Sequence, residues 1–300
     1  MAAWLEVRDY IATGNWPTER ARWYCEQLER NEILYFPAPP FPFSSEDRQF
    51  LLSQRASDSR LHKNVSYRPT TDVLRGFSGD ESATERMHRI LREYSADVTE
   101  FVARFLAPYG SKVLLDYASF RPLEEEGRDL PLHKRNDLLH VDAFPSRPTK
   151  GGRILRVFTN VSERDRVWIT TDRFTSLAQR YARDAGLPQI ASSSAGRKVA
   201  HLLHSVGLPV ADRSAYDQFM LRFHDWLKEN TAFQSDCPKI KIEFPPMSTW
   251  LVFTDGVPHA VLSGQYALEQ TFIVPPEALV SPQDAPIRVL EKIAAVPLGR

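Results

Sequence analysis

The chain has 300 residues with 38 acidic and 38 basic side chains, so no overall positive field favours nucleic acid as a partner. Apolar residues are frequent enough for a large core, but no run approaches the about 18–20 apolar residues of a membrane-spanning helix. Two cysteines exclude a disulfide scaffold. Glu6, Arg8 and Asp9 interrupt the region where a signal peptide would be apolar, so we expect a cytoplasmic protein.

The first third of the chain predicts helices separated by irregular segments. Residues 18–30 suit a short helix, which a proline-rich stretch follows. Ser82 and Glu85 have the spacing of a capping box and predict the start of a long helix that ends near Pro108. Apolar residues recur along it with a period of about 3.6, so we expect one face to pack on a sheet. They are Met87, Ile90, Leu91, Tyr94, Val98, Phe101, Val102 and Phe105.

From residue 112 onward the pattern changes to short runs rich in β-branched and aromatic residues, punctuated by Pro, Gly and Asp. Residues 172–186 and 215–234 predict helices inserted between two sets of strands. Many short strands with turn signals favour an α+β fold whose mostly β core is a sandwich or jelly roll. The predicted strands are KVLLDYASF, DLLHVDAF, RILRVFTNV, RVWIT, KIKIEF, TWLVFTD and ALEQTFIV.

A candidate metal site begins in the segment LLHVDAF. Residues two apart in an extended segment project to the same side, so His140 and Asp142 point together. His259, where a strand meets a Gly-Val-Pro turn, can approach from a neighbouring strand. Two imidazoles and one carboxylate on one face leave open positions on a metal, as in Fe(II) oxygenases. The alternative is that His140 is a buried histidine hydrogen-bonded to its neighbours.

Long strings around these residues resemble the Kdo hydroxylases, which act on 3-deoxy-D-manno-oct-2-ulosonic acid (Kdo), and more broadly the 2-oxoglutarate oxygenases. The resemblance covers essentially the whole chain. The strings are HVDAFPSRPTKGGRILRVFTNV, FTDGVPHAVLSGQYALEQTF, KNVSYRP and FHDWLKEN.

The resemblance implies a double-stranded β-helix (jelly roll, cupin-like) flanked by helices. We expect one catalytic domain over 1–300, with a mainly helical part at 1–110 that packs on the sheet. The jelly-roll core would span 111–280, with a helical insertion at about 172–234.

The resemblance also implies an activity. Iron would be held by His140, Asp142 and His259, with Fe(II), 2-oxoglutarate and O₂ as cofactor and co-substrates. The reaction would hydroxylate C3 of Kdo in lipopolysaccharide, giving the sugar acid called Ko, and release succinate and CO₂. No catalytic residue beyond the metal ligands is expected.

The expected anchor for 2-oxoglutarate is an arginine. Many members of the superfamily place one shortly beyond the distal histidine, where this chain has Gln270. Another branch supplies it from a strand after the first ligands, which points to Arg153 or Arg156. On an ideal strand these two arginines face opposite sides, so only one should point inward. Thr159, Gln270 and Tyr266 are candidate neutral donors.

A sugar acid on a phosphorylated carrier calls for cationic and amide side chains. We expect these mainly in the loop before the metal segment, although a basic loop is often simply solvated. The acidic run Glu124–Glu126 is predicted to be an exposed loop. The candidate substrate-binding residues are Lys63, Tyr67, Arg68, Arg121, His133, Lys134, Arg135 and Asn136.

The implied partner is a Kdo-containing lipid A precursor or the lipopolysaccharide inner core, which suggests transient contact with the inner face of the cytoplasmic membrane. Three rival functions stay open at this point. They are the same chemistry on another metabolite or a protein side chain, a cupin-like isomerase or hydrolase that uses another metal, and a non-enzymatic sugar-binding jelly roll.

Overall fold

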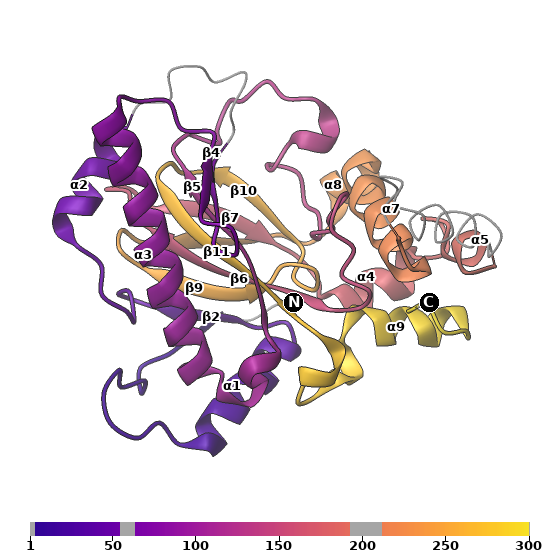
Figure 1. Ribbon diagram of the computed structural model, residues 1–300. Coiled ribbons are helices and arrows are strands. Elements are labelled where there is room, and N and C mark those ends of the chain that lie inside the picture. Colours follow the sequence, from indigo (N-terminus) through magenta and orange to yellow (C-terminus); the bar gives the residue numbers. More distant parts are fainter. Residues whose placement is uncertain (1–3, 55–63, 193–211, 300) are drawn as a thin grey trace.

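The computed structural model describes residues 4–54, 64–192 and 212–299, and shows two β-sheets with helices on either side (Figure 1). Within the described residues the larger sheet has the order β1-β2-β9-β6-β11-β5-β3-β4 and the smaller one β10-β7-β8. Neighbouring strands are antiparallel except β1 and β2. The strands are β1 (Trp4–Glu6), β2 (Ile33–Phe36), β3 (Val65–Arg68), β4 (Val73–Arg75), β5 (Leu114–Arg121), β6 (Arg153–Asn160), β7 (Arg166–Thr170), β8 (Ile240–Phe244), β9 (Thr249–Phe253), β10 (His259–Ser263) and β11 (Ala267–Val274).

Helices cover the outer face of the larger sheet and the end of the sandwich. The α-helices are α1 (Thr18–Glu29), α2 (Ser45–Ser53), α3 (Glu81–Phe105), α4 (Phe174–Tyr181), α5 (Leu187–Ser192), α7 (Ala215–Glu229), α8 (Thr231–Asp236) and α9 (Pro286–Ala294). Short 3₁₀ turns are η1 (Ala107–Lys112), η2 (Leu132–Lys134), η3 (Pro276–Ala278) and η4 (Pro282–Asp284). In the described part of the chain, no helix is both long and apolar enough to cross a bilayer.

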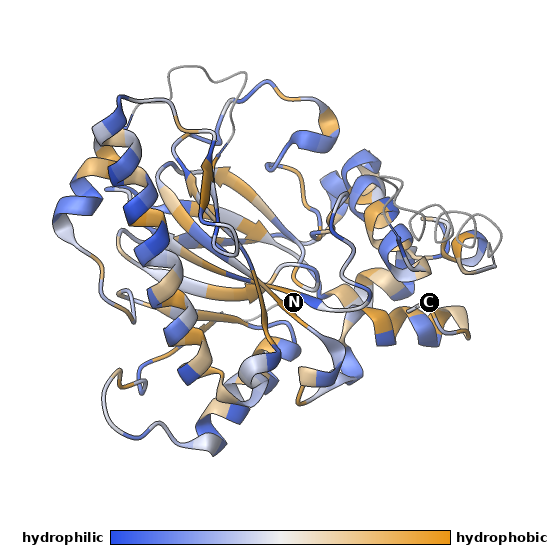
Figure 2. Ribbon diagram, viewed as in Figure 1, coloured by the Kyte–Doolittle hydropathy of each residue, from blue (hydrophilic) through white to orange (hydrophobic). Residues whose placement is uncertain are grey.

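The long helix α3 lies on the larger sheet, as its apolar stripe predicts (Figures 1 and 2). Its buried face, including Met87, Val98 and Phe105, joins Leu155 and Phe272 of the sheet in one hydrophobic cluster. The predicted N-cap, Ser82, is wrong, because the helix begins about half a turn earlier. Asp80 caps the helix, and its carboxylate accepts a hydrogen bond from the Ala83 N–H at 2.8 Å.

A second cluster fills the space between the two sheets. Trp168 from β7 meets Phe158 from β6 and Trp250 from β9 edge to face, with ring centroids 5.1 and 5.5 Å apart. Phe244 stacks on Trp250 at 3.8 Å. Large aromatic groups provide most of the apolar area here, and they set the separation of the sheets.

The third cluster lies where helices α4, α5, α7 and α8, which follow β7 and precede β8, pack with α9. Leu139 and Val141, beside the predicted metal ligands, belong to it. This cluster therefore joins the helical insertion to the segment that carries His140.

The sheet-rich core with flanking helices confirms the predicted fold class. Several local predictions differ from the structure. The first third, expected to be helical and irregular, also contains strands β1, β2, β3 and β4. The segment DLLHVDAF forms only an isolated bridge, between His140 and His259, rather than a strand. Residues after the Gly-Val-Pro turn form β10, a strand that was not predicted.

Candidate metal centre and its cavity

His140 and His259 face each other across the single antiparallel bridge. The His140 N–H donates to the His259 carbonyl at 3.1 Å, and the His259 N–H donates to the His140 carbonyl at 2.9 Å. The Asp142 N–H donates to the Thr254 carbonyl at 2.9 Å, just beyond the end of β9. As a result, potential ligand atoms of His140, Asp142 and His259 all lie within 4.8 Å of one another.

Backbone carbonyls fix the tautomer of both histidines. His140 Nδ1 lies 2.7 Å from the Leu138 carbonyl, and His259 Nδ1 lies 2.9 Å from the Val257 carbonyl. A carbonyl only accepts, so each Nδ1 carries the proton and each Nε2 offers a lone pair. The Trp168 ring stacks on His259 with centroids 5.0 Å apart and holds that imidazole in place.

The charge states of these groups suit metal binding. Burial lowers the pKa of both His140 and His259, which keeps the imidazoles neutral. Burial alone would raise the pKa of Asp142, but the Arg156 guanidinium, with Nε 3.0 Å from Oδ2, helps to lower it well below its usual range. The donor set is therefore two neutral imidazoles and one carboxylate, which fits Fe(II) and leaves three coordination positions open.

A cavity of about 240 Å³ adjoins these three residues. Strands of both sheets, the loop that follows η2, and helix α7 form its wall. Its lining combines several cationic side chains with the apolar Phe158, Trp168 and Val261. The lining residues are Asn64, Arg121, His133, Lys134, Asn136, His140, Asp142, Arg156, Phe158, Arg166, Trp168, His224, Lys228, His259 and Val261.

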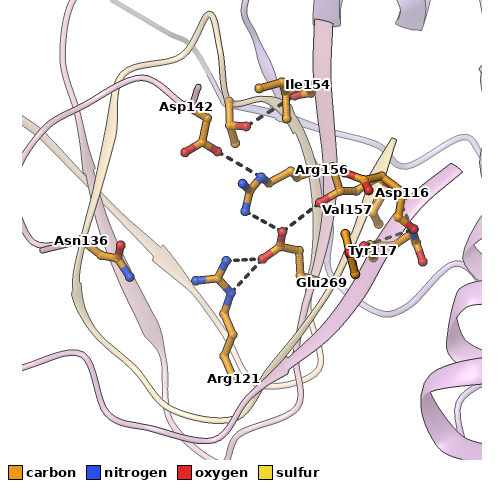
Figure 3. A network of polar contacts seen from close by, with 12 residues as sticks. Asp116, Tyr117, Arg121, Asn136, Asp142, Ile154, Arg156, Val157 and Glu269 are labelled. Atoms are coloured by element: carbon orange, nitrogen blue, oxygen red, sulfur yellow. Dashed lines mark hydrogen bonds and ion pairs between the residues drawn. The ribbon is translucent and has the colours of Figure 1, made fainter. Parts of the chain in front are cut away.

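Glu269 on β11 links two arginines at this cavity (Figure 3). It accepts hydrogen bonds from Arg156 Nη1 at 2.5 Å and from Arg121 Nε at 2.8 Å. Thr271 adds a third donor at 3.0 Å. Burial alone would raise the pKa of Glu269, but the two guanidinium groups lower it, so the carboxylate stays ionised and holds both arginines in fixed positions.

A third arginine completes the cationic wall. Arg166 is fully buried, and its Nη1 donates to the Gly264 carbonyl at 2.9 Å. Its Nη2 lies 3.7 Å from Glu125. Burial, together with the nearby Arg121 charge, lowers the pKa of Arg166 to about 10. The guanidinium therefore remains charged at neutral pH and attracts anions into the cavity.

Of the residues predicted to bind 2-oxoglutarate, only Arg156 lines the cavity. Strand alternation is the reason. On β6, Arg156 and Phe158 face the cavity, so Arg153 and Thr159 face the opposite way. Arg153 pairs with Asp255 at 2.8 Å, and the Thr159 hydroxyl lies 3.0 Å from that of Thr249.

The same alternation on β11 directs Gln270 away from the cavity. Its amide nitrogen donates to the Asp116 and Thr271 carbonyls at 3.1 and 2.9 Å. Tyr266, just before the strand, packs on the outer core, with its ring stacked on Phe120 at 6.2 Å. Neither residue lines the cavity.

The predicted substrate residues divide between the cavity and the surface. Arg121, His133, Lys134 and Asn136 line the cavity. The other described candidates lie elsewhere and have other partners. Tyr67 donates to Asp72 at 2.9 Å, Arg68 lies over the ring of Tyr117 at 4.8 Å, and Arg135 pairs with Asp137 at 2.5 Å. Lys63 lies outside the described residues.

Several cavity residues were not predicted. Arg166 begins β7, and Glu269, which binds two of the lining arginines, lies within the buried strand β11, so a charge within a core strand was the available signal. His224 and Lys228 line the cavity from α7. The expectation of an exposed acidic loop was wrong for Glu125, which is 6% exposed and accepts from Asn136 at 3.1 Å.

The jelly-roll core and its His-Asp-His group place the chain in the class of non-haem Fe(II)- and 2-oxoglutarate-dependent dioxygenases. A sequence model of the 3-deoxy-D-manno-oct-2-ulosonic acid (Kdo) hydroxylase family matches residues 13–297, and the chain belongs to that family.

Solved structures agree with this assignment. Three solved structures of the Kdo hydroxylase KdoO are each 34% identical to this chain, and each alignment covers 98% of this chain and 97% of KdoO. The TM-scores are 0.85 for the apo form, 0.84 for the complex with α-ketoglutarate (2-oxoglutarate) and Fe(III), and 0.83 for the complex with succinate and Fe(III). No curated protein sequence matched the chain.

Proposed function

We propose that this chain hydroxylates C3 of a Kdo unit in lipopolysaccharide, converting it to Ko while 2-oxoglutarate and O₂ yield succinate and CO₂. One observation carries the proposal. A His-Asp-His group opens onto an arginine-lined cavity in a chain that belongs to the Kdo hydroxylase family. That combination provides both a place for a redox metal and a cationic pocket for two organic acids.

In this proposal Nε2 of His140, Nε2 of His259 and the carboxylate of Asp142 hold iron. Arg156 binds the far carboxylate of 2-oxoglutarate, with Arg121 beside it across Glu269. Arginine suits this task because its planar fork grips a carboxylate with parallel hydrogen bonds. Glu269 orients both guanidinium groups before the co-substrate arrives.

When bound, iron with 2-oxoglutarate and O₂ supplies the oxidising power for C–H hydroxylation. The residues of this chain bind, orient and shield the reactants. Phe158, Trp168 and Val261 provide an apolar wall beside the ligands, which limits access of water. His133, Lys134 and Asn136, from the loop before the metal segment, provide donors for sugar hydroxyls and phosphates.

The direct test combines ligand binding with product analysis. His140→Ala should abolish anaerobic Fe(II) binding, succinate release and addition of one oxygen atom to Kdo, because one of the three ligands is lost. His88→Ala is a matched control, since His88 is partly exposed and pairs with Asp72 at 3.0 Å away from the cavity. If purified wild type leaves the mass of a Kdo-containing lipid unchanged while it releases succinate, the proposed substrate is wrong.

If the substrate is a Kdo-containing lipid A precursor, the enzyme binds it at the inner face of the cytoplasmic membrane. The cationic cavity favours a phosphorylated, carboxylated headgroup over neutral lipid. Vesicle flotation tests this location. The protein should co-float with vesicles that carry the Kdo lipid at low salt and dissociate as the salt concentration rises. Equal binding to neutral vesicles would contradict it.

A further inference from the structure

Helix α7 places two unexplained polar side chains on the cavity wall. His224 and Lys228 are four residues apart, so they project from the same face of the helix, and both line the cavity. The His224 and His140 rings meet edge to face with centroids 4.9 Å apart. The helical insertion therefore reaches the candidate metal centre directly.

His224 presents a hydrogen-bond acceptor. Its Nδ1 lies 2.7 Å from the Val141 carbonyl, so Nδ1 carries the proton, and Nε2 is left with a lone pair. No described residue hydrogen-bonds Nε2. A neutral imidazole held in this way accepts a hydrogen bond from a hydroxyl group, which a sugar has in abundance.

Lys228 has no carboxylate within 4.0 Å among the described residues, and Asp142, Asp225 and Asp137 act on it only from a longer distance. The residue is 3% exposed, and its ammonium donates to the His133 carbonyl at 3.1 Å, which uses one of three donors. Burial lowers the pKa of Lys228 to about 8. Buried charges in proteins are normally paired, so a buried ammonium on a cavity wall calls for an anion from outside the chain.

The arginines at the cavity each have a carboxylate within 4.0 Å. Arg121 and Arg156 both pair with Glu269, and Arg156 also pairs with Asp142. The buried Arg166 pairs with Glu125, which Arg128 shares. Lys228 has no such partner among the described residues. On the proposed function, the carboxylate of the sugar acid would supply one.

We propose that Lys228 binds the carboxylate of the sugar acid and that His224 Nε2 accepts a hydrogen bond from a neighbouring hydroxyl. This inference rests on the proposed function. The carboxyl carbon of Kdo is C1, two bonds from C3, so a cation that fixes C1 on the α7 side restricts where C3 can lie. Specificity for an acidic sugar then comes from the helical insertion, while the sheets and the segment with His140 and Asp142 hold metal and co-substrate.

The test compares two substrates and three variants. Wild type should hydroxylate a Kdo-containing lipid A precursor at least about 10-fold more efficiently, in kcat/KM, than its carboxyl methyl ester, as expected for a charge-assisted contact. Lys228→Gln keeps a donor for the His133 carbonyl but should lose this preference, with KM for 2-oxoglutarate unchanged. Lys228→Arg should restore the preference. Lys239→Gln is the control, because Lys239 donates to the Gln234 carbonyl on the surface of the insertion.

His224→Leu should raise KM for both lipids and increase succinate release per hydroxylated sugar, while His224→Gln should recover part of the loss. Retention of the acid preference by Lys228→Gln, or a raised KM for 2-oxoglutarate in that variant, would overturn the assignment and leave the proposed function intact. A wild type that hydroxylates neither lipid would overturn both.

Discussion

Arg153 and Arg156 are three residues apart on β6 and have opposite surroundings. Arg153 is fully buried in the outer layer, where Asp255 and Asn31 accept from it at 2.8 and 2.7 Å. Its ion pair joins the start of β6 to the turn after β9. Arg156 lies at the cavity, between Asp142 and Glu269. The first arginine has a structural role and the second is available to a ligand.

Matched substitutions of these two arginines should separate stability from co-substrate binding. Arg153→Met leaves Asp255 buried without its partner and should lower the free energy of unfolding by about 3–5 kcal/mol, with affinity for 2-oxoglutarate unchanged. Arg156→Met should weaken 2-oxoglutarate binding roughly 10-fold or more through loss of a charge-assisted contact. Urea unfolding and co-substrate titration at low temperature measure the two effects. The reverse pattern would show that the strand faces are assigned wrongly.

Helix α3 is the element that supports the larger sheet from outside. Its buried stripe spans the helix from Met87 to Phe105. Because the stripe continues along the whole length, the position of the first turn determines how the remaining turns meet the sheet. That first turn depends on Asp80, whose carboxylate satisfies a backbone N–H that would otherwise have no partner.

The cap of α3 gives a prediction for this element. Asp80→Ala should lower the free energy of unfolding by about 1 kcal/mol, since an N-cap acceptor and a favourable dipole interaction are both lost. Ser82→Ala is the control, because Ser82 is exposed and does not cap the helix. Urea denaturation of both variants provides the measurement. An equal loss in the two variants would indicate that the helix begins at Ser82 instead.

At the scale of the whole molecule, two parts of the fold meet at the cavity: the pair of β-sheets and the helical insertion. The sheets contribute His259, Arg121 and Arg156, and the insertion contributes His224 and Lys228. The segment with His140 and Asp142 runs between them, because its apolar neighbours Leu139 and Val141 pack with the insertion. A ligand in the cavity contacts both parts and should stabilise them together.

Ligand addition and removal test this coupling. Fe(II) and 2-oxoglutarate are added without oxygen, each at a concentration of about a hundred times its Kd. Each ligand should then raise the free energy of unfolding by about 2.7 kcal/mol and increase Tm by several degrees. A chelator should reverse the shift. His140→Ala should show no shift on addition of metal. An equal rise of Tm in that variant would mean that the metal binds elsewhere.

Local patterns predicted much of the fold, whereas pairing between distant segments decided the rest. The stripe from Met87 to Phe105 and the run RVWIT predicted α3 and β7 because side-chain periodicity is a local property. The strand expected around His140 is only a bridge, since its backbone groups bond to β10 and to the Thr254 carbonyl instead.

The site was predicted unevenly for the same reason. The spacing of His140 and Asp142 indicated shared chemistry, but whether Arg153 or Arg156 faced inward depended on the face of β6 that meets the second sheet. The positions of His224 and Lys228 depend on how the insertion packs against Leu139 and Val141, and no local pattern reveals that contact. A charged residue within a core strand, such as Glu269, was the one sequence signal of the buried ion pairs beside the cavity.

The antiparallel β-bridge between His140 and His259 affects how this enzyme acquires iron rather than another divalent metal. With His140 and His259 clamped by reciprocal backbone hydrogen bonds, the proposed pocket is preformed and has little freedom to favour one divalent ion by changing its shape. Intrinsic affinities should then rise from manganese through iron and cobalt to copper, with zinc also binding more strongly than iron. Loading with iron would reflect which ions the cell leaves available, and zinc contamination during purification would be a ready source of inactive protein.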